Sequence, residues 1–440
     1  MFQYGKHIGV LFLVAVICCC GVQGAVTEDL NVTYHLGGPN NINSYTDIQA
    51  VSAAPGGGYY LGILQDATVS LMKTDAAGSE IWRKTFPGEE VRTLLTLEDG
   101  GVLLATTTMT IANDTTGYTF GGNTYLIRAD ADGNAVWNQQ LVDTGAGDML
   151  VTGNQIKFAG WFWESMSGFT QSFLLESGAP ANDQIRLGNE TTARIPLGMV
   201  LADDGTLVLT GGTTASLAEE SQEAWIANVK NGITLWDTVI RTGSQDPMYG
   251  PGACGYALCK TADGGYMVVG SNPPYRVTVA AGIAWAASVD ASGNVEWVKE
   301  IEGCYAPYGI VPFGKEYLIA GMSGYDFPVW LTLTSGGATT QLSSPGVQGR
   351  FNDIALTSST TAAVAGWSYL TDEPDGLFIT LSTTETTPST PSASLDGTPV
   401  WVWALGGIIC LIIVGGIVYF VALRKPASSE KKGKSSGKKR

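Results

Sequence analysis

Residues 130–137 read DADGNAVW, and their polar spacing admits two interpretations. Asp130, Asp132 and Asn134 alternate as oxygen ligands do at the start of a calcium loop, but no glutamate follows at the required distance. The other interpretation is an Asp/Gly/Asn hairpin between two strands, with Trp137 on the second strand. We favour the hairpin, and calcium stays a candidate cofactor.

The spacing of this octapeptide recurs in the chain. It returns in DAAGSEIW at residues 75–82 and in DASGNVEW at residues 290–297, while Gly232 and Trp236 keep its second half. Strand-like runs precede each copy, and glycine turns open further runs upstream. Seven units of four strands, A to D, fit between Thr46 and Ser382, at about 48 residues a unit. This period predicts an all-β fold, a seven-bladed β-propeller of four-stranded blades, with six or eight blades as the alternatives.

The seventh unit has no fourth strand, because the chain becomes rich in Thr, Ser and Pro after residue 382. A strand-like segment, Asn31–Leu36, precedes the first unit. We expect this N-terminal strand to complete the last blade and close the ring, which removes the open sheet edges that favour aggregation.

The two ends of the chain predict export and anchoring. Residues 1–24 have the layout of a secretory signal peptide. After the propeller at 25–382, a Thr/Ser/Pro-rich stalk spans 383–399, and the uncharged apolar segment 400–423 is long enough for a transmembrane helix. The basic tail, 424–440, predicts a cytoplasmic C-terminus by the positive-inside rule. We therefore expect a single-pass protein of the cell membrane with an extracellular propeller.

Charge narrows the range of partners. Of the net charge of −16, the tail contributes +7 and Lys6 contributes +1, which leaves the intervening chain at −24. Such an acidic ectodomain repels nucleic acid, so we expect no nucleic-acid partner. The glycosylation sequons at Asn31, Asn113 and Asn189 agree with an exported glycoprotein.

The repeat resembles two kinds of known propeller repeat. It is similar to the tryptophan-docking repeat of quinoprotein dehydrogenases, from which the Asp-to-Gly spacing differs by one residue, but the cofactor-binding features of that family have no counterpart in the mature chain. Taken whole, residues 32–382 resemble the Asp/Gly/Trp-repeat β-propellers on the surfaces of methanogenic archaea and some bacteria. This resemblance implies a cell-surface location and an architecture, but no reaction.

The loops divide unequally between the two faces of such a propeller. The A–B and C–D turns are short, whereas the B–C and D–A loops are long and varied, so we expect binding on the long-loop face. The candidate ligand-binding residues there are aromatic: Trp161, Trp163, Trp367 and Tyr369. Exposed aromatic rings stack on sugars or anchor protein interfaces; the competing interpretation is that they cap the blade ends.

Three aspartates start innermost strands in this alignment: Asp47, Asp148 and Asp353. They are predicted at the channel mouth, where carboxylates bind a cation or act as acid and base in glycoside hydrolysis. We favour the alternative that each accepts backbone N–H groups of its own loop. Cys254 and Cys304 precede consecutive blades in an oxidising compartment and predict a disulfide.

Two functions follow from these features. The favoured one is a non-catalytic surface module whose long-loop face binds a glycan or an envelope protein. The alternative is a propeller glycosidase or lyase that uses the channel-mouth carboxylates. With His35 as the one histidine after the signal peptide, histidine-based metal sites and Ser-His-Asp catalysis are not expected.

Overall fold

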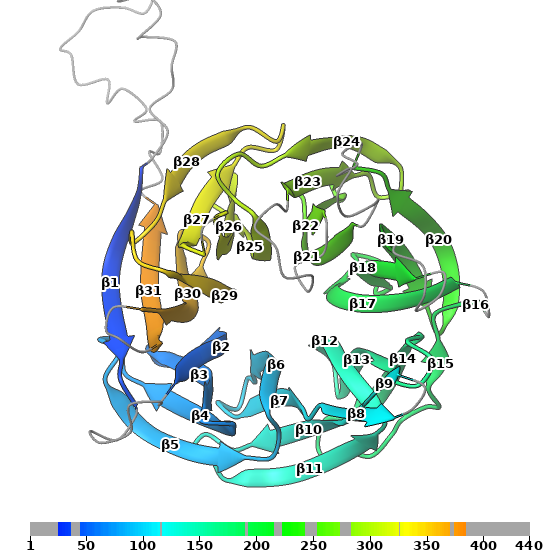
Figure 1. The fold of residues 1–440 in the computed structure, drawn as a ribbon, viewed down its shortest axis with the longest axis horizontal. Helices are drawn as coiled ribbons and strands as arrows, with labels where there is room; N and C mark the ends of the chain where they lie inside the picture. Colours follow the sequence, from blue (N-terminus) through cyan, green and yellow to red (C-terminus); the bar gives the residue numbers. More distant parts are fainter. Residues whose placement is uncertain are drawn as a thin grey trace, which may run out of the picture. The chain divides into compact units, whose positions relative to one another are not determined.

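The computed structural model shows a ring of seven antiparallel sheets around a central axis (Figure 1). The described residues are 25–36, 45–114, 117–189, 192–214, 222–242, 253–272, 283–324, 326–369 and 374–383. Each sheet contributes four strands to the ring, ordered from the axis outward. The predicted seven-bladed propeller of four-stranded blades is confirmed.

The first four blades follow the order of the chain. Blade 1 comprises β2 (Thr46–Ala53), β3 (Tyr59–Gln65), β4 (Thr68–Thr74) and β5 (Glu80–Phe86). Blade 2 comprises β6 (Glu90–Thr96), β7 (Val102–Thr107), β10 (Asn123–Ala129) and β11 (Ala135–Val142). Blade 3 comprises β12 (Thr144–Thr152), β13 (Gln155–Phe162), β14 (Gly168–Leu174) and the short β15 (Ile185–Arg186). Blade 4 comprises β17 (Thr192–Leu201), β18 (Leu207–Thr214), β19 (Gln222–Lys230) and β20 (Ile233–Ile240), with β16 (Gly188–Asn189) paired to β17.

The remaining blades complete the ring. Blade 5 comprises β21 (Cys254–Lys260), β22 (Tyr266–Asn272), β23 (Ile283–Val289) and β24 (Val295–Glu300). Blade 6 comprises β25 (Ala306–Phe313), β26 (Glu316–Met322), β27 (Pro328–Leu333) and β28 (Thr339–Ser343). Blade 7 comprises β29 (Gly349–Ser358), β30 (Thr361–Ser368), β31 (Asp375–Thr383) and β1 (Val26–Tyr34).

The N-terminal strand closes the ring as predicted. β1 pairs antiparallel with β31, from Val26 opposite Thr383 to Tyr34 opposite Gly376. Gln341 of blade 6 then joins the new outer strand to its neighbour: Val26 N–H donates to Gln341 Oε1, and Gln341 Nε2 donates to Val26 O, both at 3.0 Å. The first and last segments of the propeller therefore stabilise one another.

The DADGNAVW segment is a hairpin turn between β10 and β11. Asp130 Oδ1 accepts the backbone N–H groups of Asp132 and Asn134, at 3.0 and 2.8 Å, while Asp130 Oδ2 accepts the Asn134 side chain. Gly133 takes the left-handed conformation, with φ of 80°, that the turn requires. These bonds occupy the carboxylate within its own turn and lower the Asp130 pKa.

The Gly and Trp of the repeat join neighbouring blades. Gly133 of blade 2 lies against Trp82 of blade 1, where an added Cβ would come within 2.6 Å of the indole. The same contact joins Gly178 to Trp137, Gly293 to Trp236, and Gly337 to Trp297. The repeat therefore pairs the turn glycine of one blade with the outer-strand tryptophan of the blade before it.

The hydrophobic core is divided among the interfaces between blades. Seven clusters of buried side chains lie one at each of the seven interfaces. In the interface between blades 1 and 2, for example, Leu71 and Tyr60 pack against Leu104 and Ile127. Small buried residues on the middle strands, such as Ala105 and Ala320, let adjacent sheets approach closely. Each blade is thus stabilised by two neighbours, and ring closure supplies the missing neighbour of blade 1 and blade 7.

The two faces differ less regularly than the loop lengths predict. The turns from first to second and from third to fourth strands span at most five residues, except for residues 175–184 between β14 and β15. The opposite face has the longest connections, one of which contains the hairpin of β8 (Thr110–Asp114) and β9 (Gly117–Gly121). It also has short ones, at Asp66–Ala67, residues 87–89 and Asp143, and Asp66, Ala67 and Asp143 have positive φ.

The predicted signal peptide, stalk, transmembrane helix and basic tail lie outside the described residues. Within the described part of the chain, no helix has the length and apolar character needed to cross a membrane.

Candidate functional site

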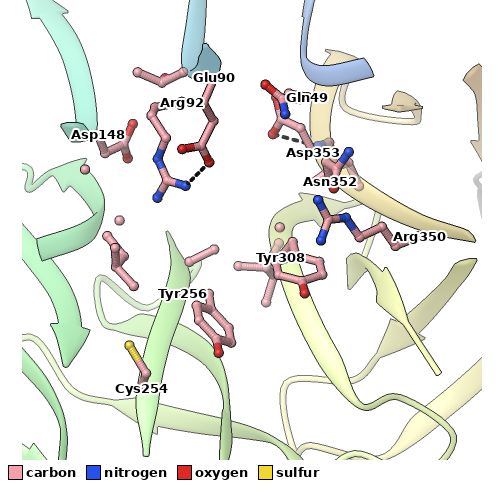
Figure 2. Close-up of a pocket in the computed structure, with 18 of the residues that line it drawn as sticks. Gln49, Glu90, Arg92, Asp148, Cys254, Tyr256, Tyr308, Arg350, Asn352 and Asp353 are labelled. Carbon is pink, nitrogen blue, oxygen red and sulfur yellow. Dashed lines mark hydrogen bonds and ion pairs between the residues drawn. The ribbon is translucent and has the colours of Figure 1, made fainter. Parts of the chain in front are cut away.

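A cavity of about 1390 Å³ occupies the centre of the ring, with lining residues from all seven blades. Its walls come from the innermost strands, β2, β6, β12, β17, β21, β25 and β29. Met166, Ser323 and Gln348, from connections on the long-loop face, also line it, so the cavity reaches that face. It is the main candidate site in the described residues (Figure 2).

Each innermost strand carries a β-bulge at an equivalent position. A bulge sets two residues opposite one on the neighbouring strand and redirects a side chain. The bulged residues are Gln49, Arg92, Gly147, Leu197, Tyr256, Tyr308 and Asn352. Every one of them lines the cavity. Each blade therefore contributes one bulged residue to the wall of the channel.

One side of this wall is polar and fixed in place. Asn352, Gln49 and Arg92, from blades 7, 1 and 2, form what we call the polar arc. Asn352 Nδ2 donates to Ile48 O at 2.9 Å, and Arg92 Nε donates to Ala146 O at 3.1 Å. Gln49 Oε1 accepts the Val91 N–H at 2.7 Å. Each partner is the residue before the bulge of the next blade, so the polar arc also fastens neighbouring blades together.

The opposite side of the wall is apolar. Leu197, Tyr256 and Tyr308, from blades 4, 5 and 6, form what we call the aromatic arc. The rings of Tyr256 and Tyr308 lie 5.7 Å apart between centroids, and the Arg350 guanidinium lies 5.8 Å from the Tyr308 centroid. Gly147, the bulged residue of blade 3, lies between the two arcs. No side chain fits at this position, because a Cβ there would come within 2.2 Å of Pro196 O. Figure 2 shows the two tyrosines across the cavity from Gln49 and Arg92.

Asp148 and Asp353 follow the bulges of blades 3 and 7 and fasten blades together. Asp353 Oδ1 accepts the Ile354 N–H and its Oδ2 accepts the Val51 N–H of blade 1, both at 2.8 Å. Asp148 accepts the Met149 N–H and the Met199 N–H of blade 4, also at 2.8 Å. The expected role in binding backbone N–H groups therefore holds for both, although one donor of each comes from the next blade rather than from the residue's own loop.

Burial raises the pKa of both carboxyl groups. The pKa of Asp148 rises to about 6, and the backbone donors and Arg92 oppose this rise. The pKa of Asp353 rises to about 7, again by burial, with a smaller contribution from the charge of Asp148. Both groups therefore titrate close to neutral pH.

Asp47 is not equivalent to the other two aspartates. It lies two residues before the bulge of blade 1, is fully buried, and is 3.6 Å from the Arg350 guanidinium. Tyr45 Oη and Gln49 Nε2 donate to its Oδ2 at 3.2 and 3.3 Å, and Asn352 Nδ2 donates to its Oδ1. Burial raises its pKa against the effect of Arg350. The Asp47 side chain does not line the cavity, but its hydrogen bonds fix Gln49 and Asn352 of the polar arc in position.

The aromatic candidates have different environments. Trp161 and Trp163 are 3% and 6% exposed and stack edge to face, with 5.5 Å between their rings. Trp161 packs on Gly145, and the burial of both indoles agrees with the competing interpretation that these side chains cap the blade ends. Trp161 still lines the cavity. Trp367 is half-buried beside the exposed Tyr369, 5.1 Å away and perpendicular to it.

The predicted Cys254–Cys304 disulfide is absent: both side chains are thiols. Cys254 Sγ donates to Gly255 O and lines the channel, whereas Cys304 Sγ donates to Met322 O and packs in the core between blades 5 and 6. The two cysteines are not at equivalent positions: Cys254 lies two residues before the bulge of blade 5, and Cys304 lies four residues before the bulge of blade 6. Burial raises the pKa of Cys304 to about 12, so its thiol is protonated and unreactive.

Glycan attachment was predicted from the sequence, and calcium was kept only as a candidate cofactor. Within the described residues, no group of three or more His, Cys, Asp or Glu side chains could hold a metal ion. Asn31 is exposed on the outer strand β1, while Asn113 and Asn189 lie in β8 and β16 with side chains outside the described set.

The polar and aromatic arcs were missing from the sequence prediction. Among the predicted site residues, the structure brings Asp148, Asp353 and Trp161 to the cavity, while Asp47 supports it from behind. The bulged residues lie eight to ten residues before the second strand of their blade, and ten before it in blades 1, 2, 4 and 5. Aligning these four units on the second strand would have placed Gln49, Arg92, Leu197 and Tyr256 in one column.

Comparisons with known proteins agree with the fold and go no further. No protein-family model matches the sequence, and no curated protein matches it. The WD40 domain of Neurospora crassa Pan2 is similar in structure, with a TM-score of 0.53 and 9% identity over 81% of this chain and 95% of that one. A protein of unknown function from Dyadobacter fermentans has a TM-score of 0.48 and 10% identity, over 81% and 99% of the two chains. The Dos1 propeller has a TM-score of 0.45 and 10% identity, over 75% and 78%. The chain is therefore a β-propeller, the class of fold that its repeat predicts.

Proposed function

We propose that this protein is a membrane-anchored surface propeller that binds a glycan or an envelope protein without catalysis. The observation that supports this most directly is the cavity of about 1390 Å³ that reaches the long-loop face. Ligand pockets are commonly about 300–1,000 Å³, so this one accommodates an extended ligand. The signal peptide and apolar C-terminal segment of the sequence support export and anchoring.

Hydrogen bonding of the carboxylates supports binding rather than hydrolysis. A glycosidase needs one carboxyl as acid and another as nucleophile or base, each with an oxygen directed at the substrate. Asp148 and Asp353 instead each accept backbone N–H groups from two blades. Asp47 is bound by Tyr45, Gln49 and Asn352. Hydrolysis of polysaccharide by the native protein that is lost on substituting these aspartates would establish the enzymatic alternative.

A pull-down with the 25–399 fragment tests the proposed function. The fragment contains the complete ring, because β1 and β31 pair within it. Immobilised fragment is exposed to solubilised envelope extract and to isolated envelope polysaccharide, and we expect saturable retention of one of them. Tyr369→Ala on the long-loop face is compared with Ile233→Ala, an exposed apolar residue next to a short turn. Retention that weakens with Ile233→Ala alone, or no retention at all, contradicts the proposal.

A further inference from the structure

The channel wall has a chemical polarity that specifies the kind of ligand it accepts. Amide and guanidinium groups of the polar arc face the cavity from blades 7, 1 and 2, and the aromatic arc faces it from blades 4, 5 and 6. A ligand between these arcs needs one apolar face and one polar edge. Figure 2 shows this separation in the positions of Gln49, Arg92, Tyr256 and Tyr308.

The polar arc has side-chain donors and acceptors that its hydrogen bonds within the protein do not use. Arg92 uses Nε on Ala146 O and Nη1 on Glu90, so its Nη2 has no partner among the described residues. Asn352 uses Nδ2 on Asp47 and Ile48, which leaves Oδ1 as an acceptor. Gln49 Nε2 donates to Asp47 and retains a second N–H. Sugar hydroxyls both donate and accept, so this mixture matches them better than it matches a carboxylate, which only accepts.

The polar arc is also rigid. Each of its side chains is bound to the backbone of the next blade, and Asp47 is bound to two of them. Side chains that are already fixed lose little conformational entropy when a ligand binds. Polar groups held in this way act as a preformed set of hydrogen-bonding partners.

The aromatic arc supplies the complementary surface. Tyr256 and Tyr308 are half-buried, and their ring planes meet at 39°. Ser271 Oγ donates to Tyr256 Oη at 3.0 Å and fixes the ring from the blade side. The C–H face of a pyranose packs against tyrosine rings, while its hydroxyls point outward from the ring edge.

We propose that the channel binds a saccharide, with a pyranose face on Tyr256 and Tyr308 and its hydroxyls toward Asn352, Gln49 and Arg92. This inference rests on the proposed function and selects the glycan over the envelope protein as the ligand of the cavity. The cavity volume of about 1390 Å³ allows several sugar rings along the channel axis.

Titration calorimetry of the 25–399 fragment with linear hexaoses of glucose, mannose and galactose tests the assignment. We expect at least one hexaose to bind, Tyr308→Ala and Tyr256→Ala to weaken it by about tenfold or more, and Tyr308→Phe to restore it. The control is Phe120→Ala, which removes an exposed ring of the β8–β9 hairpin outside the channel lining. Tyr369→Ala reports on the alternative, a glycan site on the long-loop face outside the channel. Circular dichroism confirms that each variant is folded.

The outcomes separate this inference from the proposed function. A hexaose whose binding falls with Tyr369→Ala and not with the channel variants overturns the channel site but keeps a glycan-binding module. Envelope protein retained on the long-loop face, with no hexaose bound, overturns the saccharide and keeps the proposed function. If neither sugar nor protein binds, both fail.

Discussion

Asp353 on blade 7 accepts a hydrogen bond from the backbone N–H of Val51 on blade 1, with 2.8 Å between Oδ2 and N. This bond crosses the seam where the beginning and the end of the propeller meet. Its other oxygen, Oδ1, accepts the Ile354 N–H beside the bulge. The carboxylate therefore accepts one backbone donor on each side of the seam.

Replacing this carboxylate should weaken the closure of the ring. Asp353→Asn presents an amide N–H₂ to one of the two backbone donors, which leaves that donor unsatisfied. We expect a loss of about 1–3 kcal/mol in the free energy of unfolding at pH 8, above the Asp353 pKa of about 7, measured by urea denaturation of the 25–399 fragment. Asp132→Asn is the control, because Asp132 is exposed in a turn. Equal stability of the two variants would refute a role for Asp353 at the seam.

Stability should fall as pH rises toward neutrality. The folded-state pKa values of about 7 for Asp353 and about 6 for Asp148 lie above the usual aspartate value, so folding takes up protons between about pH 4 and pH 7. Their combined effect between pH 5 and pH 8 is on the order of 4 kcal/mol. We expect a higher melting temperature at pH 5 than at pH 8. The pH dependence of the melting temperature should be weaker in the Asp148→Asn/Asp353→Asn double variant. An unchanged pH dependence in that variant would show that other titratable groups cause it.

The glycine–tryptophan contact between blades should be intolerant of a side chain. Gly133→Ala places a Cβ within 2.6 Å of Trp82 and also strains a left-handed residue. Gly205→Ala is the matched control, since Gly205 has φ of 78° and nothing within 4 Å of an added Cβ. We expect about 1 kcal/mol of strain at both sites and about 1–3 kcal/mol more at Gly133. The denaturation midpoints of the two variants measure these losses in stability. Equal losses for Gly133→Ala and Gly205→Ala would show that the Trp82 indole moves aside without a cost in free energy.

Removal of the closing strand should open the ring. A fragment that begins at residue 45 lacks β1 and leaves β31 with an unpaired edge. Exposed strand edges pair with other chains, so we expect self-association together with a lower melting temperature. Size-exclusion chromatography with light scattering compares this fragment with the 25–399 fragment. A stable monomer would show that β1 is dispensable.

The channel and core cysteines should behave as thiols. The 25–399 fragment contains Cys254, Cys259 and Cys304, and all three are buried thiols. We expect slow reaction with a thiol reagent in the native state and reaction of all three in denaturant without reductant. Mass spectrometry under non-reducing conditions checks the same point, and a mass two hydrogens lower would restore the disulfide prediction.

Regular parts of this fold follow from local sequence. In six of the seven units a glycine turn followed by an apolar run precedes the second strand, and in the seventh the turn is Ser359 and Thr360. The innermost strands β12 and β29 begin four residues before Asp148 and Asp353, where the sequence predicted their starts. The bulge interrupts the alternation of side chains there, and alternation is the signal by which a strand is recognised.

The candidate site depends on contacts that the linear pattern does not contain. Asp47, Asp148 and Asp353 were grouped because each was predicted to start an innermost strand, yet a shift of three residues relative to the bulge separates Asp47 from the others. Cys254 and Cys304 were paired by position, yet one faces the channel and the other faces the core. A one-residue change of register moves a side chain to the other face of a strand, so spacing alone cannot decide such cases.

The sequence by itself determined the repeat, the blade count, the closing strand and the unequal faces of this protein. Each of these features is encoded locally, in turns that require Gly and Asp and in tryptophans at a fixed distance from them. Only the tertiary structure decided which residues meet in the channel. The bulges of the innermost strands turn Gln49, Arg92, Tyr256, Tyr308 and Asn352 toward one cavity, which forms only when the seven blades close into a ring.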